Sequence, residues 1–128
     1  MKFKLVSLSA LFFATLAMQP AAQAADATLA IEQMAEIMLK LEAKPGADAQ
    51  MTLDDIAKDS ASTENERSLA STIKNMDKKI RPDDKPRVMK VWLSPASSEF
   101  EREMAKILLR FDETPSDDAK QALSTWVE

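Results

Sequence analysis

The chain has 128 residues, of which 45% are hydrophobic and 30% charged, and its formal net charge is −4. The absence of Cys and His excludes disulfides, thiol nucleophiles and any role for imidazole as acid, base or metal ligand. The single Gly excludes a glycine-rich phosphate-binding loop, and the acidic charge argues against nucleic-acid binding.

The beginning of the chain has the pattern of a secretory signal peptide. Lys2 and Lys4 precede a mainly apolar run over residues 5–18, and the Ala-Gln-Ala sequence at 22–24 provides the small residues of a cleavage site. The apolar run is short for a membrane span, and no second long apolar stretch follows it. We therefore expect a bacterial protein that is periplasmic or secreted, with no transmembrane segment in the mature chain.

This leader divides the chain into a signal peptide over residues 1–24 and one helical domain over 25–128. Cleavage would lower the number of basic residues from 17 to 15 against 21 acidic ones, giving a net charge of −6. Few Gly and aromatic residues remain, while Ala, Leu, Met, Lys and Glu are frequent, which favours helices over strands. We predict an all-α fold, a compact bundle of four main amphipathic helices plus one or two short helices.

The first main helix is predicted over about residues 28–43. Its apolar side chains recur at helical spacing at Ile31, Met34, Ile37, Met38 and Leu41. The Lys-Pro-Gly sequence at 44–46 ends it, because Pro cannot extend the hydrogen-bond ladder. A short helix should follow from residue 52 to about residue 58.

The second main helix begins with the capping box Thr63-Glu64-Asn65-Glu66 and is predicted to continue to about Ile80. Its narrow apolar stripe consists of Leu69, Ile73, Met76 and Ile80. The segment 87–93 has residues that suit a strand, but no second strand exists to pair with it. We therefore predict a short buried helix there.

The last two main helices begin at a capping box over residues 98–101 and at Thr114-Pro115, where Pro suits the first helical position. No internal repeat is expected. The predicted core comprises Ile31, Met34, Met38, Leu41, Leu69, Ile73, Met76, Phe100, Met104, Ile107, Phe111, Leu123 and Trp126.

A basic stripe is the most suggestive surface feature. Arg67, Lys74, Lys78 and Arg81 would share one side of the helix over 63–80, opposite its apolar stripe. Residues 74–90 contain seven basic and three acidic side chains within an acidic protein. The stripe therefore predicts a contact surface for an anionic partner, the alternative being an ordinary solvated face.

Two weaker patterns could carry chemistry. Met34 and Met38 lie one helical turn apart and provide thioether ligands of the kind that Cu(I) prefers, although Met also fills cores. The spacing of Ser71 and Lys74 matches the S-x-x-K motif of serine enzymes that bind penicillin, but the companion motifs are absent.

Acidic pairs occur at residues 54–55, 83–84 and 117–118. Each pair could bind a hard metal, but each also falls in or just before the first turn of a predicted helix. Negative charge stabilises a helix N-terminus, so we expect a capping role for all three pairs.

These features favour a non-catalytic interaction protein, such as a chaperone, an inhibitor or an accessory subunit, with no catalytic residues and no cofactor. The partner would be an anionic protein, lipid or glycan, and not a nucleic acid. The alternative is a binder of a small ligand or Cu(I) between Met-lined helices. The oligomeric state is left open.

Overall fold

The computed structural model describes residues 27–127, so the predicted signal peptide at 1–24 lies outside the described residues. Helices make up 68% of the described chain, and none of its residues forms a strand, which confirms the all-α prediction. The elements are α2 (Leu29–Leu39), α3 (Ala47–Lys58), α4 (Glu64–Asn75), the 3₁₀ helix η2 (Pro82–Asp84), α5 (Lys85–Leu93), α6 (Glu99–Arg110) and α7 (Asp117–Trp126). In this part of the chain, no helix is both long and apolar enough to cross a membrane.

Several helix boundaries differ from the prediction. α2 ends at Leu39 and α4 at Asn75, both earlier than predicted. The cause is a tight turn after each helix, in which Ala43 and Lys78 have φ angles of 71° and 70°, outside the right-handed helical region. α3 begins at Ala47 and has 12 residues, so it is not the short helix that was expected.

The helices form three copies of one 35-residue unit, so the expectation that the chain contains no repeat was wrong. Each unit has an inner helix (α2, α4 or α6), a tight turn and an outer helix (α3, α5 or α7). The inner helices begin after Thr28, Thr63 and Ser98, which are spaced by 35 positions. Each of these hydroxyls accepts a hydrogen bond from the backbone N–H three residues later and so caps its helix.

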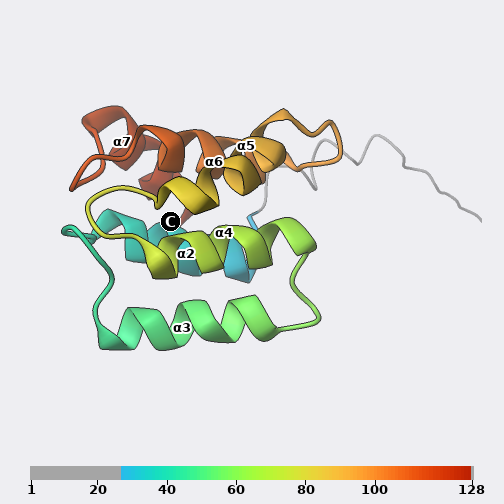
Figure 1. The fold of residues 1–128 in the computed structure, drawn as a ribbon, viewed down its shortest axis with the longest axis horizontal. Helices are drawn as coiled ribbons and strands as arrows, with labels where there is room; N and C mark the ends of the chain where they lie inside the picture. The colour runs from blue at the N-terminus through green and yellow to red at the C-terminus, as the bar shows by residue number, and fades with distance from the viewer. Residues whose placement is uncertain (1–26, 128) are drawn as a thin grey trace, which may run out of the picture.

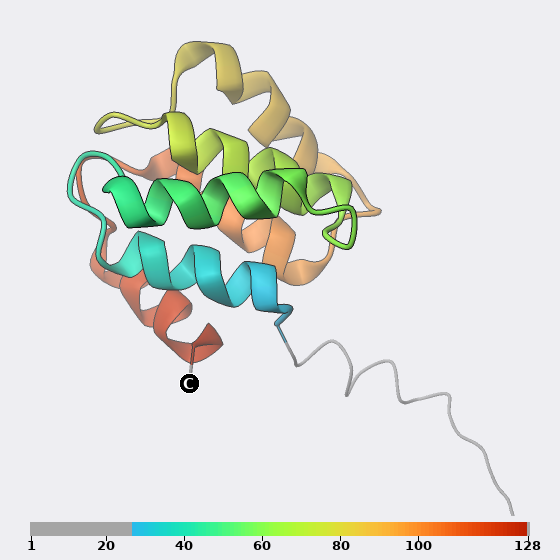
Figure 2. The ribbon, with the colours of Figure 1, turned by 90° about the horizontal axis from the view of Figure 1, so that it is seen from below.

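The three units close into a ring. The outer helix of each unit packs mainly on the inner helix of the next, α3 on α4 and α5 on α6, and α7 returns to α2 (Figures 1 and 2). Equivalent positions of the three inner helices hold Ala35, Ala70 and Ala105, all fully buried. Such small side chains allow helices to approach closely. The molecule therefore has a pseudo-threefold axis with the inner helices around it.

At one end of the inner helices, the three turns are joined by a closed ring of backbone hydrogen bonds. The N–H of Ala43 donates to the carbonyl oxygen of Glu113 (2.8 Å), that of Glu113 to Lys78 (2.7 Å), and that of Lys78 to Ala43 (2.6 Å). All three residues have positive φ angles, between 67° and 71°. Left-handed backbone is uncommon outside Gly and Asn. Because all three turns have a left-handed residue and these residues are hydrogen-bonded to one another, we infer that the ring of hydrogen bonds stabilises this backbone conformation.

At the other end of the inner helices, hydroxyl groups connect one unit to the next. Thr28 Oγ1 donates to Glu66 Oε2 (2.6 Å), and Thr63 Oγ1 donates to Glu101 Oε2 (2.7 Å). Both Glu side chains are buried, and each also accepts from the backbone N–H of the residue that caps its own helix. The equivalent position of the first unit holds the buried Ile31, which has no carboxylate, so Ser98 lacks the corresponding acceptor there.

The predicted core is buried except at two positions. Phe100 and Trp126 are half-buried, and their rings meet edge to face with centroids 5.5 Å apart. The segment 87–93 is helical as predicted, within α5, but only Val88 and Val91 are buried there. α5 is an outer helix of the ring and does not lie at the centre of the fold.

Candidate functional site

The residues of the predicted basic stripe do not share one helical side. α4 ends before Lys78 and Arg81, which lie in the segment between α4 and η2. Arg67 is on α4, but its guanidinium donates to the carbonyl oxygens of Ser62 and Asp59 in the preceding loop. Arg67 therefore stabilises the connection between α3 and α4, and the stripe was wrong as a continuous surface.

Lys74 is also engaged within the fold. Its Nζ lies 2.9 Å from Oδ1 of Asp54 on α3, and Lys58 Nζ lies 2.8 Å from the other oxygen of the same carboxylate. Hydrogen bonds from Lys58 and then Lys74 hold the pKa of Asp54 below its ordinary value. Asp54 thus bridges α3 and α4. It lies well inside α3, so the expectation that it caps a helix N-terminus was wrong.

The other two stripe residues line a groove between the second and third units. We name this groove the basic groove. It has a volume of about 680 Å³, within the range of ligand pockets. The segment before and into α5 forms one wall, and the C-terminal part of α6 forms the other. Its charged lining consists of Lys78, Lys79, Arg81, Lys85, Arg110, Asp77 and Asp112, and its apolar lining of Ile80, Pro82, Leu108, Leu109 and Phe111.

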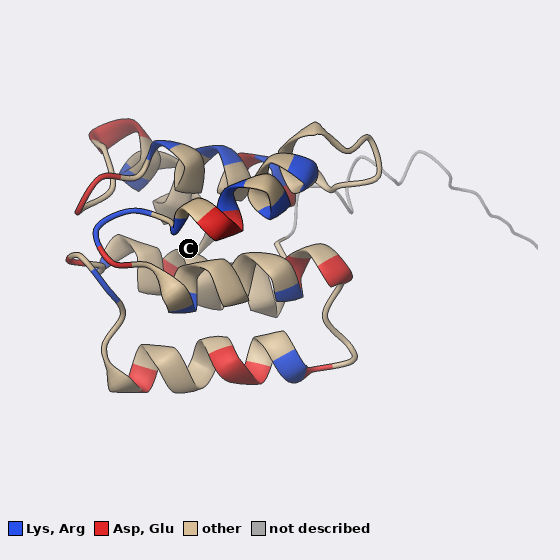
Figure 3. Ribbon diagram, in the orientation of Figure 1, with Lys and Arg blue, Asp and Glu red and all other residues tan. Residues whose placement is uncertain are grey.

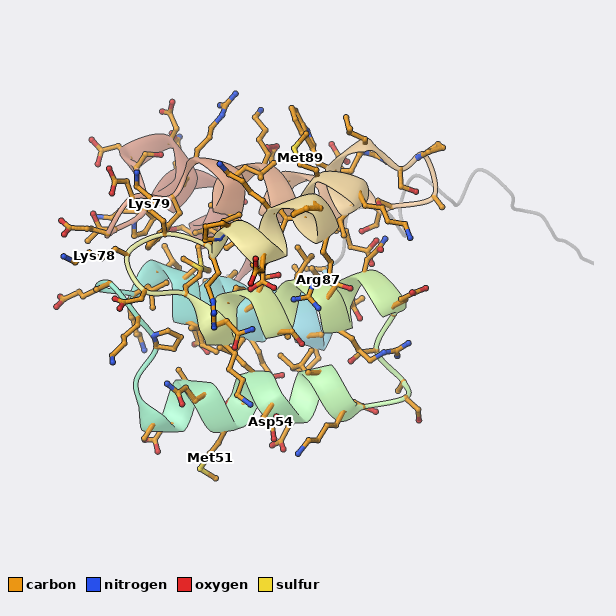
Figure 4. All side chains as sticks on the ribbon, in the orientation of Figure 1. Met51, Asp54, Lys78, Lys79, Arg87 and Met89 are labelled. Carbon is orange, nitrogen blue, oxygen red and sulfur yellow. The ribbon has the colours of Figure 1, made fainter. Side chains whose placement is uncertain are left out.

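The turn at Lys78 positions the basic wall of this groove. Lys78 belongs to the ring of backbone hydrogen bonds, which anchors the start of the segment that continues through Arg81 to Lys85. Figure 3 shows basic residues along this segment, and Figure 4 shows Lys78 and Lys79 at the end of the molecule where the turns meet. Among residues 27–127, no ion pair involves Lys79, Arg81, Lys85 or Arg110, whereas Lys78 Nζ lies 3.9 Å from Glu113.

Two equivalent boundaries elsewhere in the ring have different charges. In place of the five basic residues of the basic groove, the boundary of the first and second units has Ala43, Lys44, Gly46, Gln50 and Asn75. The boundary of the third and first units has Glu113, Thr114, Ser116, Lys120 and Lys40. The same backbone arrangement thus occurs with one, two or five basic side chains, so the fold does not require the basic groove.

Arg87 lies near this segment but serves a local contact. Its guanidinium is 2.5 Å from Oδ1 of Asp84, whose side chain is only 11% exposed. Asp84 occupies the position that Ala49 and Ala119 hold in the other units. Its Oδ2 has no hydrogen-bond partner among the described residues. Arg87 is therefore best assigned to the charge of Asp84 and not to the groove.

The structure gives no support for the predicted Met, acidic-pair and S-x-x-K sites within the described residues. Met34 and Met38 are fully buried, at positions that Leu69 and Ile73 occupy in the second unit, as expected of core side chains. Within the described part of the chain, no group of three or more Asp or Glu side chains could hold a metal ion. The Lys74 that would complete the S-x-x-K motif is paired with Asp54.

No protein-family model, curated protein or solved structure matches this chain. The candidate site is therefore defined by its geometry and charge alone. In the sequence, Lys79 and Lys85 belong only to the local charge excess of residues 74–90, and Arg110 is too distant along the chain to be grouped with them. Alignment of the three units would have shown the excess at once, because residues 77–85 are far more basic than 42–50 and 112–120.

Proposed function

We propose that this protein is an exported, non-catalytic binding protein whose basic groove contacts an anionic partner. The observation that carries the proposal is the charge difference between the basic groove and its two equivalents in the ring. Clustering of like charges opposes folding, and Lys79, Arg81 and Lys85 have no ion-pair partner among residues 27–127 to offset it. A bound anion would provide that compensation.

The chain composition supports a binding role over catalysis. Without His or Cys, it lacks the side chains that most often transfer protons or act as nucleophiles near neutral pH. The leader pattern of residues 1–24 supports export to the periplasm or the medium. Sequencing the N-terminus of exported protein tests this part, and we expect Ala25, or a residue within one or two of it, as the first residue.

The proposed binding role is tested with a charge-only probe, a short fluorescent poly-glutamate peptide at low ionic strength. The groove variant is Lys79→Gln/Arg81→Gln/Lys85→Gln. The control is Lys40→Gln/Lys44→Gln/Lys120→Gln, which removes the same charge at positions equivalent to Arg110, Lys79 and Lys85 in the other two boundaries. Lys74 is left unchanged in both because it holds Asp54.

We expect the groove variant to bind the probe at least about tenfold more weakly than the wild type, a difference of about 1.4 kcal/mol. The control should bind within about twofold of the wild type, and wild-type binding should weaken as salt is added. Equal weakening of the two variants would show that only the net charge matters, and would overturn the proposal.

A further inference from the structure

The basic groove has an apolar floor beneath its charged rim. Leu108 and Phe111 are buried there, while Leu109 is half-buried and Pro82 is exposed. A purely ionic partner would leave this floor unused. We propose, on the basis of the binding role above, that the partner is a polypeptide segment in which Asp or Glu residues flank one large apolar side chain.

The placement of apolar residues argues for a peptide and against a membrane surface. Proteins that bind a membrane surface project apolar side chains outward beside their basic residues. The most exposed large apolar side chains described here are Leu29, Met51 and Leu93, and none of them lines the basic groove. Met51, for example, projects from α3 at the lower edge of Figure 4, away from Lys78 and Lys79. Apart from Pro82, the apolar residues that line the groove are buried or half-buried, so the partner has to supply the projecting group.

The mixed charge of the lining argues for a peptide and against a uniform polyanion. Asp77 and Asp112 lie in the groove among its five basic residues. Phosphate or sulfate polymers carry only negative groups and would be repelled at these two carboxylates. A polypeptide offers backbone N–H donors that a carboxylate can accept, in addition to the acidic side chains that pair with Lys and Arg.

The internal repeat provides a matched test of the floor. Leu109 of α6 is equivalent to Leu39 of α2, and both side chains are half-buried. Leu109→Gln removes an apolar side chain from the basic groove without changing charge. Leu39→Gln makes the same change at the equivalent position of another unit.

The experiment uses two peptides that differ at one residue. One has a central Phe flanked by Glu residues, and the other has Ser in place of Phe. We expect wild-type protein to bind the Phe peptide about tenfold more tightly than the Ser peptide, as expected for partial burial of an aromatic ring. Leu109→Gln should reduce this preference to about threefold or less, while Leu39→Gln should retain it.

Equal binding of the two peptides by wild-type protein would overturn this inference, whether or not Leu109→Gln folds. The poly-glutamate measurement would still decide the proposed function. Binding to phosphatidylglycerol vesicles that the Phe peptide does not displace would also overturn the peptide assignment in favour of a membrane. If neither the peptides nor poly-glutamate bind, the proposed function fails as well.

Discussion

Thr63 Oγ1 donates a 2.7 Å hydrogen bond to Oε2 of Glu101, which joins the first residue of one repeat to a buried carboxylate in the next. Thr28 and Glu66 form the same contact one unit earlier. Each threonine thereby caps its own helix and also donates to one oxygen of a buried carboxylate, whose other oxygen accepts from a backbone N–H. Local capping and the packing of neighbouring units are coupled through one side chain.

This coupling predicts that removing equivalent cap hydroxyls lowers the free energy of unfolding by different amounts. Thr63→Ala should lower the free energy of unfolding by about 2–4 kcal/mol, because it removes a helix cap and leaves a buried oxygen of Glu101 without its donor. Ser98→Ala should cost about 1 kcal/mol, the value of a cap alone, because its partner position holds Ile31. Urea unfolding measures both, and equal losses would contradict a role for the contact between units.

The repeat also predicts that one buried position tolerates a charge. Glu at position 31 would take the place that Glu66 and Glu101 have, with the N–H of Thr28 and the hydroxyl of Ser98 within its reach. Ile31→Glu should therefore cost less than half as much stability as Ile73→Glu, which would bury a carboxylate with no comparable donors, at a cost of about 3–5 kcal/mol. Thermal unfolding of the two variants gives the comparison. Similar destabilisation of the two variants would show that a Glu at position 31 does not form the hydroxyl–carboxylate hydrogen bond found at the other two boundaries.

The ring of turns predicts that Gly is favoured at three positions. Ala43→Gly, Lys78→Gly and Glu113→Gly should each leave stability unchanged or raise it by up to about 1 kcal/mol, because Gly adopts positive φ without steric strain. Ala49→Gly, within α3, should instead lower stability by about 1 kcal/mol. Denaturant unfolding distinguishes the two outcomes. A loss at all three turn positions would argue against left-handed backbone there.

The bridge at Asp54 predicts a pH dependence of stability. Because the folded-state pKa of Asp54 lies below its ordinary value of 3.8, its ionised form contributes stability above about pH 3.8, and this contribution is lost as the pH falls through the folded-state pKa. The melting temperature of wild type should exceed that of Asp54→Asn near neutral pH, and the difference should shrink as the pH falls below about 3.8. A difference that is independent of pH would contradict the ion pairs with Lys58 and Lys74.

Much of the fold follows from local sequence signals. The capping boxes at Thr63 and Ser98 locate the beginnings of α4 and α6, and apolar spacing identifies most of the core. The helix ends are harder to predict, because the left-handed positions of the turns are occupied by Ala43 and Lys78 and not by Gly or Asn. The ring of hydrogen bonds between distant turns holds that geometry, and no local pattern indicates it.

The repeat is hard to recognise in the sequence, because equivalent positions of the three units share a structural role but seldom the same residue. Only Ala35 and Asp48 have the same residue at both of their equivalent positions. Core positions exchange Met, Leu and Ile, as at the equivalent residues Met38, Ile73 and Leu108, since volume and burial matter more than identity. The prediction that the basic stripe lies on one side of a helix was wrong because α4 ends at Asn75. Lys78 and Arg81 lie beyond that end and line a groove with residues of α6.

The most direct test of the binding site is to map backbone amide shifts by NMR while the acidic Phe peptide is titrated into the purified protein. If the peptide binds in the basic groove, the largest shifts should occur at residues 77–85 and 108–112, which line it. Residues 42–50 and 113–120, which are equivalent to residues of 77–85 in the other two units, should show smaller shifts. Saturable shifts confined to the first two segments would locate the ligand in the basic groove. Shifts of similar size in all three units, or shifts centred on another surface, would contradict this site.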